Sequence, residues 1–183
     1  GTKIDYAQAA DYAATVLDRI NGVSGLSATG GTWYCNASEI SALAGGTGPA
    51  EIIWRGDMSD NNDLETSNFP PSIYGKGRVN PTQNLVDAFP MANGYPISDS
   101  KSGYDPSDPY SGRDPRLANY IVINGSTQGP NNTVITTGTY GTTTDVINKE
   151  SGYSTRTGYY MRKLLRSECN PNTNYNTTAK HYS

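Results

Sequence analysis

The chain has 183 residues, enough for one ordinary domain, and its 14 Lys and Arg against 17 Asp and Glu give a net charge of −3. That balance excludes the basic face on which nucleic-acid binding depends, and no apolar run approaches the ~20 residues of a membrane span. Leu, Ile, Val and Phe number only 28, whereas 14 Tyr are available to fill a core, so we expect a folded, loop-rich chain with a thin core of its own.

The clearest element is a helix near the start of the chain. Apolar residues recur at steps of three and four over residues 4–20, which indicates one buried stripe. Asn21 and Gly22 then supply the residues that tolerate the conformation ending a helix. We expect the small Ala side chains of this stripe to let another helix approach closely. A second, short helix is expected over residues 37–43.

The next part of the chain predicts a short strand, a loop and a helix. Residues 51–54 are apolar and read as a short strand, followed by a polar loop over residues 55–77 in which Pro70-Pro71 opposes helix formation. A helix is expected from Asn80, as its N-cap, to Phe89 just before a proline.

The second half of the chain predicts turns with few regular elements. Asp-Pro and Asn-Gly pairs punctuate residues 92–117, and residues 120–123 form the best strand candidate. A second β segment or hairpin is expected within residues 133–144, and residues 159–165 are apolar enough for extended core. The tail, residues 170–183, is polar, and we expect it to be mobile.

Two groups of carboxylates invite chemical interpretations. Calcium could bind the acidic loop around Asp57, Asp60 and Asp63, but the spacing does not match the alternating ligands of an EF-hand, so a solvated loop is favoured. A second series suggests the paired carboxylates of a glycoside hydrolase. It comprises Asp99, Asp105, Asp108 and Asp114. Because three of the four precede Pro, turn formation is the favoured interpretation.

Three further features have mainly structural interpretations. Arg113-Asp114-Pro115-Arg116 could clamp an anion or sugar hydroxyls, but an Asp that pins turns is favoured. Cys35 and Cys169 lack metal-ligand spacing and could form one disulfide if the chain is exported. His181, the one histidine, lies near the chain end, where a solvated side chain is expected.

Aromatic residues in loop-like segments are the best candidates for ligand contact. Flat rings stack on the apolar faces of sugars, while neighbouring amides and carboxylates bond the hydroxyls. We therefore predict a sugar site with stacking rings and hydrogen-bonding partners. The stacking candidates are Trp33, Trp54 and Tyr74, and the hydroxyl partners are Asn61, Asn62 and Asp63.

Several ordered motifs resemble one protein family. They are EIIWRGDM (51–58), NPTQNLVDAFPMANGYPI (80–97), YDPSDPYSGRDPRL (104–117), YIVING (120–125) and STRTGYYMRKLL (154–165). Together they resemble the SusD/RagB family of Bacteroidetes surface lipoproteins. The helix containing DYAQAADYAATVLD is similar to one of the tetratricopeptide-type helices of that family's scaffold.

The resemblance implies a fold and its organisation. It implies a mainly α, SusD-like fold with a tetratricopeptide-type superhelix in the full protein, of which this chain covers part. Residues 1–44 would hold a late scaffold helix and a short helix, residues 45–169 the loop-rich portion with a few short strands, and residues 170–183 a polar tail. Family members are much longer, so we expect the remaining core to come from the rest of the polypeptide, present as a separate chain.

The resemblance also implies a function. It implies a non-catalytic, cofactor-free protein that binds starch or another oligosaccharide, or in some members peptide, on the outer membrane. The lipid anchor would lie in a segment absent from this chain. The partner would be a SusC-like TonB-dependent transporter. The motifs look structural and carry no ligand residues over. The alternatives are a glycoside hydrolase fragment with paired carboxylates and a transporter-interaction module without glycan affinity.

Overall fold

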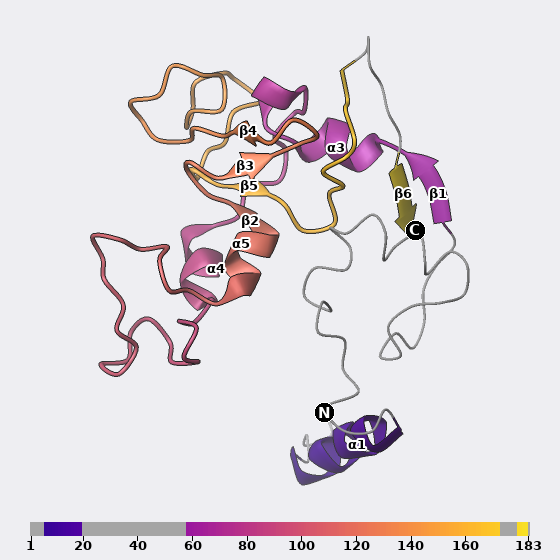
Figure 1. The fold of residues 1–183 in the computed structure, drawn as a ribbon, viewed down its shortest axis with the longest axis vertical. Helices are drawn as coiled ribbons and strands as arrows, with labels where there is room; N and C mark the ends of the chain where they lie inside the picture. The colour runs from indigo at the N-terminus through magenta and orange to yellow at the C-terminus, as the bar shows by residue number, and fades with distance from the viewer. Residues whose placement is uncertain (1–5, 20–57, 173–178, 183) are drawn as a thin grey trace.

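In the computed structural model, residues 6–19, 58–172 and 179–182 are described (Figure 1). Helix α1 spans Tyr6–Arg19 and confirms the predicted first helix; none of its residues is buried. The expected helix over residues 37–43 and the strand over residues 51–54 lie outside the described residues.

After α1, the described elements are short and separated by turns, as the composition predicts. In chain order they are β1 (Met58–Asn61), α3 (Asp63–Asn68), the 3-10 helix η3 (Pro71–Ile73), α4 (Gln83–Ala88), α5 (Pro115–Tyr120), β2 (Ile121–Val122), β3 (Thr127–Gln128), β4 (Thr133–Val134), β5 (Tyr160–Met161) and β6 (Ala179–Tyr182). None of the helices in the described ranges is long and apolar enough to cross a membrane.

The strands form three antiparallel pairs. β1 pairs with β6, with Met58 opposite Tyr182, and β2 pairs with β5, with Ile121 opposite Met161. β3 and β4 form a hairpin. Figure 1 shows β2, β3, β4 and β5 gathered near α4 and α5, while β1 and β6 lie at the far end of α3. Pairings between distant parts of the chain therefore hold together a fold that has few long elements.

Two small apolar clusters form the core of the part of the chain that the structure describes. The first joins Phe69 and Ile73 at η3 to strand and loop residues, namely Val122, Ile135, Tyr160 and Leu165. The second lies where α4 meets α5 and consists of Val86, Leu117, Ile121 and Tyr159. Tyr159 immediately precedes β5 and Tyr160 begins it, and the two side chains reach different clusters, Tyr159 the second and Tyr160 the first. Two tyrosines thus link both parts of a core that is poor in aliphatic residues.

The helix expected from Asn80 begins later than predicted. Its N-cap is Thr82, whose hydroxyl accepts from the Leu85 N–H at 3.3 Å, and not Asn80. The Asn80 side chain instead donates to the Gly77 carbonyl and accepts from the Arg156 N–H, 76 positions away. The predicted end before a proline is confirmed, because α4 stops at Ala88.

Other expected boundaries also change. The polar loop expected over residues 55–77 contains β1, α3 and η3, and the proline pair starts the 3-10 helix because its second member occupies a first-turn position. Tyr120 ends α5, so the strand expected over residues 120–123 shortens to β2. The hairpin expected within residues 133–144 lies earlier, with β3 as partner of β4.

The polar tail was expected to be mobile, and this prediction is wrong for its end. Residues 179–182 form β6, which pairs with β1 over four residues. The backbone of His181 therefore pairs with Ser59. The extended core expected over residues 159–165 is confirmed at β5 and at buried Leu165, but residues 163–164 form a turn in which Leu164 is exposed.

Candidate functional site

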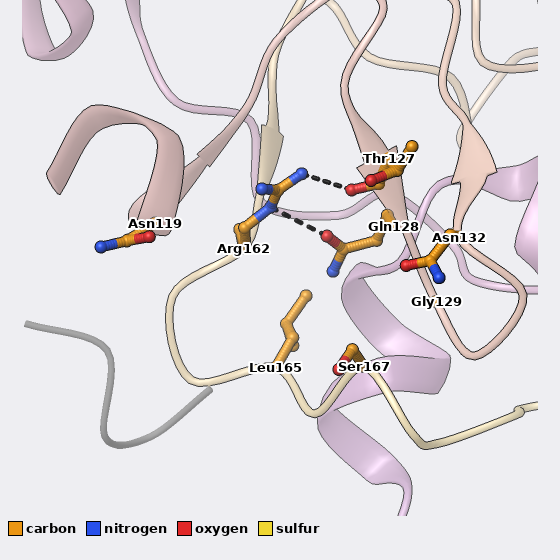
Figure 2. A pocket seen from close by; sticks show the side chains of 8 residues that line it. All are labelled: Asn119, Thr127, Gln128, Gly129, Asn132, Arg162, Leu165 and Ser167. Carbon is orange, nitrogen blue, oxygen red and sulfur yellow. Dashed lines mark hydrogen bonds between the residues drawn. The ribbon is translucent and has the colours of Figure 1, made fainter. Parts of the chain in front are cut away.

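A polar pocket of about 230 Å³ lies between the β3–β4 hairpin and the segment that follows β5. Figure 2 shows the side chains that line it. They are Asn119, Thr127, Gln128, Gly129, Asn132, Arg162, Leu165 and Ser167. The lining is mostly amide and hydroxyl groups, with Leu165 as an apolar surface. Such a lining suits a small ligand rich in hydroxyl groups.

Arg162 organises one wall of the pocket. Its Nε donates to Gln128 Oε1 at 3.0 Å, and its Nη1 donates to the Ala118 carbonyl at 2.8 Å. Its Nη2 donates to the Thr127 carbonyl and to Ser126 Oγ. The guanidinium therefore ties α5 to the hairpin. All three of its nitrogens already serve protein acceptors.

The contact with Arg162 fixes the amide of Gln128. A guanidinium has no acceptor, so the amide oxygen of Gln128 must face it. The amide nitrogen then lies on the other side of the group, toward Leu165 and Ser167 (Figure 2). Gln128 is 5% exposed, and its Nε2 has no hydrogen-bond partner among the described residues. The pocket therefore contains a donor whose orientation is fixed by Arg162.

The turn of the hairpin supplies the opposite wall. Gly129 has φ +77° and Asn132 has φ 50°, both in the left-handed region that Gly and Asn adopt most easily. The Asn132 N–H donates to the Gly129 carbonyl and closes the turn. The exposed Asn132 side chain lies across the pocket from Arg162 (Figure 2). Leu165 is 2% exposed and belongs to the first core cluster, which gives the pocket a rigid base.

The structure places the predicted site residues away from this lining. Tyr74 ends η3 with φ 69°, and its ring is 57% exposed. Asn61 belongs to β1 and its Oδ1 accepts from the Asp63 N–H at 3.1 Å; Asn62 precedes α3, and Asp63 begins it. Trp33 and Trp54 lie outside the described residues. None of the predicted site residues that are described lines the pocket.

The second series of carboxylates mostly stabilises turns, as favoured from sequence. The Oδ1 atoms of Asp99, Asp105 and Asp114 each accept from the backbone N–H two residues further on. The hydrogen bonds from Ser107 lower the pKa of Asp105. The bond from the Arg116 guanidinium is the main reason that the pKa of Asp114 is lowered. Asp105 and Asp114 are therefore held ionised as turn acceptors.

The two arginines of the Arg113–Arg116 motif have different partners. Arg116 is exposed and forms a salt bridge with Asp114. Arg113 is 7% exposed and donates to three carbonyl oxygens, those of Val86, Phe89 and Pro109, at 2.6–2.8 Å. The favoured structural role of the motif is confirmed, although the main contacts come from Arg113 and not from Asp114.

A second buried polar group lies near β1. Cys169 is fully buried, with Sγ 4.0 Å from the Asn61 carbonyl, and Glu65 accepts from the Arg166 N–H at 2.7 Å. Burial, with help from Glu65, raises the pKa of Cys169 to about 12, so the thiol stays protonated at neutral pH. Its expected disulfide partner, Cys35, lies outside the described residues, as does Asp57 of the calcium hypothesis. Within the described ranges, no three His, Cys, Asp or Glu side chains gather closely enough to hold a metal ion.

Sequence reasoning missed the pocket residues. Gln128 lies in a Gly- and Thr-rich segment that predicts no more than a turn, and its contact with Arg162 spans 34 positions. The signal available in the sequence was the set of basic residues interleaved with the apolar segment over residues 159–165. A basic residue within an extended core segment needs acceptors, and these acceptors define the pocket.

Comparisons with known proteins agree on one family. The family model described as the SusD family matches residues 43–183. A crystal structure of a SusD-like carbohydrate binding protein from Bacteroides fragilis is 22% identical, with a TM-score of 0.52, and the match covers 67% of this chain and 25% of that one. A SusD-like protein from the same organism is also 22% identical, with a TM-score of 0.51, covering 82% of this chain and 32% of that one. The chain thus spans a third or less of the solved proteins that it resembles. A comparison with curated proteins finds no match.

Proposed function

The chain belongs to the SusD family, and from this membership we propose that it binds carbohydrate as part of a longer glycan-capture protein. The observation that carries the proposal is the polar pocket with the oriented donor of Gln128. Amide and hydroxyl groups around an apolar base match the alternating hydroxyls and C–H faces of a sugar. Binding of this kind requires no bond-making chemistry.

The arrangement of carboxylates favours binding over hydrolysis. A glycoside hydrolase needs two carboxyl groups that flank a bound sugar, about 5–9.5 Å apart. Asp99, Asp105 and Asp114 accept hydrogen bonds from their own turns. The pocket is lined by amides, hydroxyls and one guanidinium, and no carboxylate is among its lining residues.

We place a second contact surface at the residues predicted from sequence. Tyr74 offers an exposed ring that could stack on a sugar, with Trp33 and Trp54 as further rings. Asn61, Asn62 and Asp63 could bond hydroxyl groups, although Asn61 Oδ1 already accepts from the Asp63 backbone. Stacking at Tyr74 and hydrogen bonding in the pocket would then hold different units of one oligosaccharide.

The cellular setting is also part of the proposal. The resemblance to SusD/RagB lipoproteins supports a place on the outer face of the outer membrane, with a lipid anchor in another part of the polypeptide. It further supports a SusC-like TonB-dependent transporter as the partner that receives the glycan. The rest of the polypeptide would complete the scaffold around α1, whose residues are all outside the core.

Affinity gel electrophoresis with a panel of polysaccharides, starch included, tests the proposal. The protein should be retarded by at least one polysaccharide, and its Trp fluorescence should be quenched by the matching oligosaccharide with no product formed. A steady release of reducing ends would instead establish a hydrolase. Capture of the transporter from outer-membrane extracts, with no retardation by any polysaccharide, would favour a transporter-interaction module.

A further inference from the structure

The amide nitrogen of Gln128 is a hydrogen-bond donor that faces the pocket, and it has no hydrogen-bond partner among the described residues (Figure 2). A polar group held in a fixed orientation at the wall of a pocket determines which ligand atoms can bind beside it. Counted over side chain and backbone together, Gln128 is 5% exposed. Its oxygen bonds Arg162, and its nitrogen faces the pocket (Figure 2). A ligand in the pocket that offers an acceptor could therefore receive a hydrogen bond from this amide.

The size of the pocket limits the ligand to one small ring. Sites for drug-sized molecules measure about 300–1,000 Å³. The volume here is about 230 Å³, enough for a single sugar unit but not for a chain of them. Leu165 offers an apolar face on one side, and the amides and hydroxyls stand around it. One sugar ring presents this combination of an apolar face and a polar rim.

The use of Arg162 argues against an acidic ligand. A carboxylate is best held by a guanidinium fork that donates two parallel hydrogen bonds. In this pocket Nε, Nη1 and Nη2 of Arg162 donate to Gln128, Ala118 and the hairpin. The donor directed at the ligand is thus a neutral amide, which suits a neutral oxygen.

We propose that the pocket accepts one neutral sugar unit, with Gln128 Nε2 donating to a hydroxyl, ring or acetamide oxygen of that unit. Gln128 is then the specificity-determining residue of the pocket, and Arg162 is the positioning residue that orients it. The inference rests on the proposed carbohydrate-binding function and adds the class of sugar, the contact and the residue.

Two variants separate the donor from its support. Gln128→Glu keeps an oxygen for Arg162 Nε and replaces the donor with an acceptor, so the wall should stay in place. Gln128→Met removes both the oxygen that accepts from Arg162 and the amide donor. Asn84→Asp serves as the control. It adds the same negative charge as Gln128→Glu, but on the exposed face of α4, distant from Gln128 in the sequence. Thermal unfolding of all three shows that each variant is folded.

The measurement is a titration followed in the ¹H–¹⁵N spectrum, with affinities from calorimetry. The side-chain NH₂ signals of Gln128 are assigned by their loss in Gln128→Glu. The probes are the methyl glycosides of glucose, galactose, mannose and N-acetylglucosamine, with glucuronic acid as the acidic probe. At least one neutral glycoside should shift these signals, and both Gln128 variants should bind it about tenfold or more weakly than the control does.

The outcomes distinguish this inference from the function on which it rests. Retardation by a polysaccharide combined with unshifted Gln128 signals would overturn the pocket and leave carbohydrate binding intact. Wild-type affinity in Gln128→Glu with loss in Gln128→Met would assign the effect to Arg162 and refute the donor role. Tighter binding of glucuronic acid than of every neutral glycoside would overturn the neutral class. Binding of no polysaccharide and no glycoside would end both proposals.

Discussion

The carboxylate of Asp145 and the residue Ser72, 73 positions apart, are joined by two hydrogen bonds. The Ser72 backbone N–H donates to Oδ1 at 2.9 Å, and the Ser72 hydroxyl donates to Oδ2. Asp145 is fully buried, and its own backbone carbonyl accepts from the Tyr160 hydroxyl at 3.0 Å. This pair therefore attaches η3 to the loop that covers the first core cluster.

The buried carboxylate should make stability depend on pH. Burial raises the pKa of Asp145 above its usual value, against the bonds from Ser72, which lower it. The folded state thus holds the proton more tightly than the unfolded chain. The resulting stabilisation is complete below the unfolded pKa of about 3.9 and is lost as pH rises through the folded pKa.

Asp145→Asn tests this dependence. The amide does not titrate, so the free energy of unfolding of the wild type, minus that of the variant, should fall as pH rises from about 4 to 7. Urea unfolding across that range measures it. Ser72→Ala should move the fall to higher pH, because it removes a bond that lowers the pKa. A difference that does not change with pH would show that Asp145 is not protonated more readily in the folded state.

A second prediction concerns Arg113. Its guanidinium donates to the carbonyls of Val86 and Phe89 at the end of α4 and lies 5.6 Å from the ring of Tyr104; the Val86 carbonyl also accepts from the Phe89 N–H at 3.3 Å. Arg113→Met keeps the length of the side chain but removes the three hydrogen bonds that the guanidinium donates to carbonyl oxygens. We expect a loss of about 3 kcal/mol or more in the free energy of unfolding.

Arg116→Met is the matched control for Arg113→Met. The Arg116 side chain is 57% exposed and bonds Asp114 at the surface, so its removal should cost about 1 kcal/mol or less. Chemical unfolding of the two variants under the same conditions compares them. Equal losses would mean that the three carbonyl contacts of Arg113 contribute no more than an exposed ion pair.

Sequence reasoning succeeded where local chemistry decides the structure. The Asp-Pro turns and the helix stop at Pro90 depend on residues within a few positions, and both are observed. It failed where a distant partner decides. Asn80 has the residue type of an N-cap, but its side chain accepts a hydrogen bond from the Arg156 N–H. The hydroxyl of Thr82 caps α4 instead.

The same limit explains the missed strand and the missed pocket. Residues 59–61 are all polar and do not alternate with apolar ones, so no periodicity marks β1; the strand exists because residues 179–182 pair with it. Gln128 is likewise unremarkable until Arg162 orients its amide. A site built from such long-range contacts has no local motif, whereas exposed rings such as Tyr74 can be nominated from loop position alone.

Tyr74 gives the sharpest test of the second contact surface. Its backbone has φ 69°, where most residues are strained and Asn or Gly is tolerated, and its ring is exposed. Tyr74→Asn therefore removes the ring without adding backbone strain, and the free energy of unfolding should change by less than about 0.5 kcal/mol or rise. If the ring stacks on a sugar, affinity for the bound oligosaccharide should fall about tenfold. Calorimetry measures that affinity, and Tyr140→Asn, which removes a fully exposed ring elsewhere, should leave it unchanged. Equal losses in the two variants, or none in Tyr74→Asn, would remove Tyr74 from the proposed surface and leave the pocket at Gln128 as the site of binding.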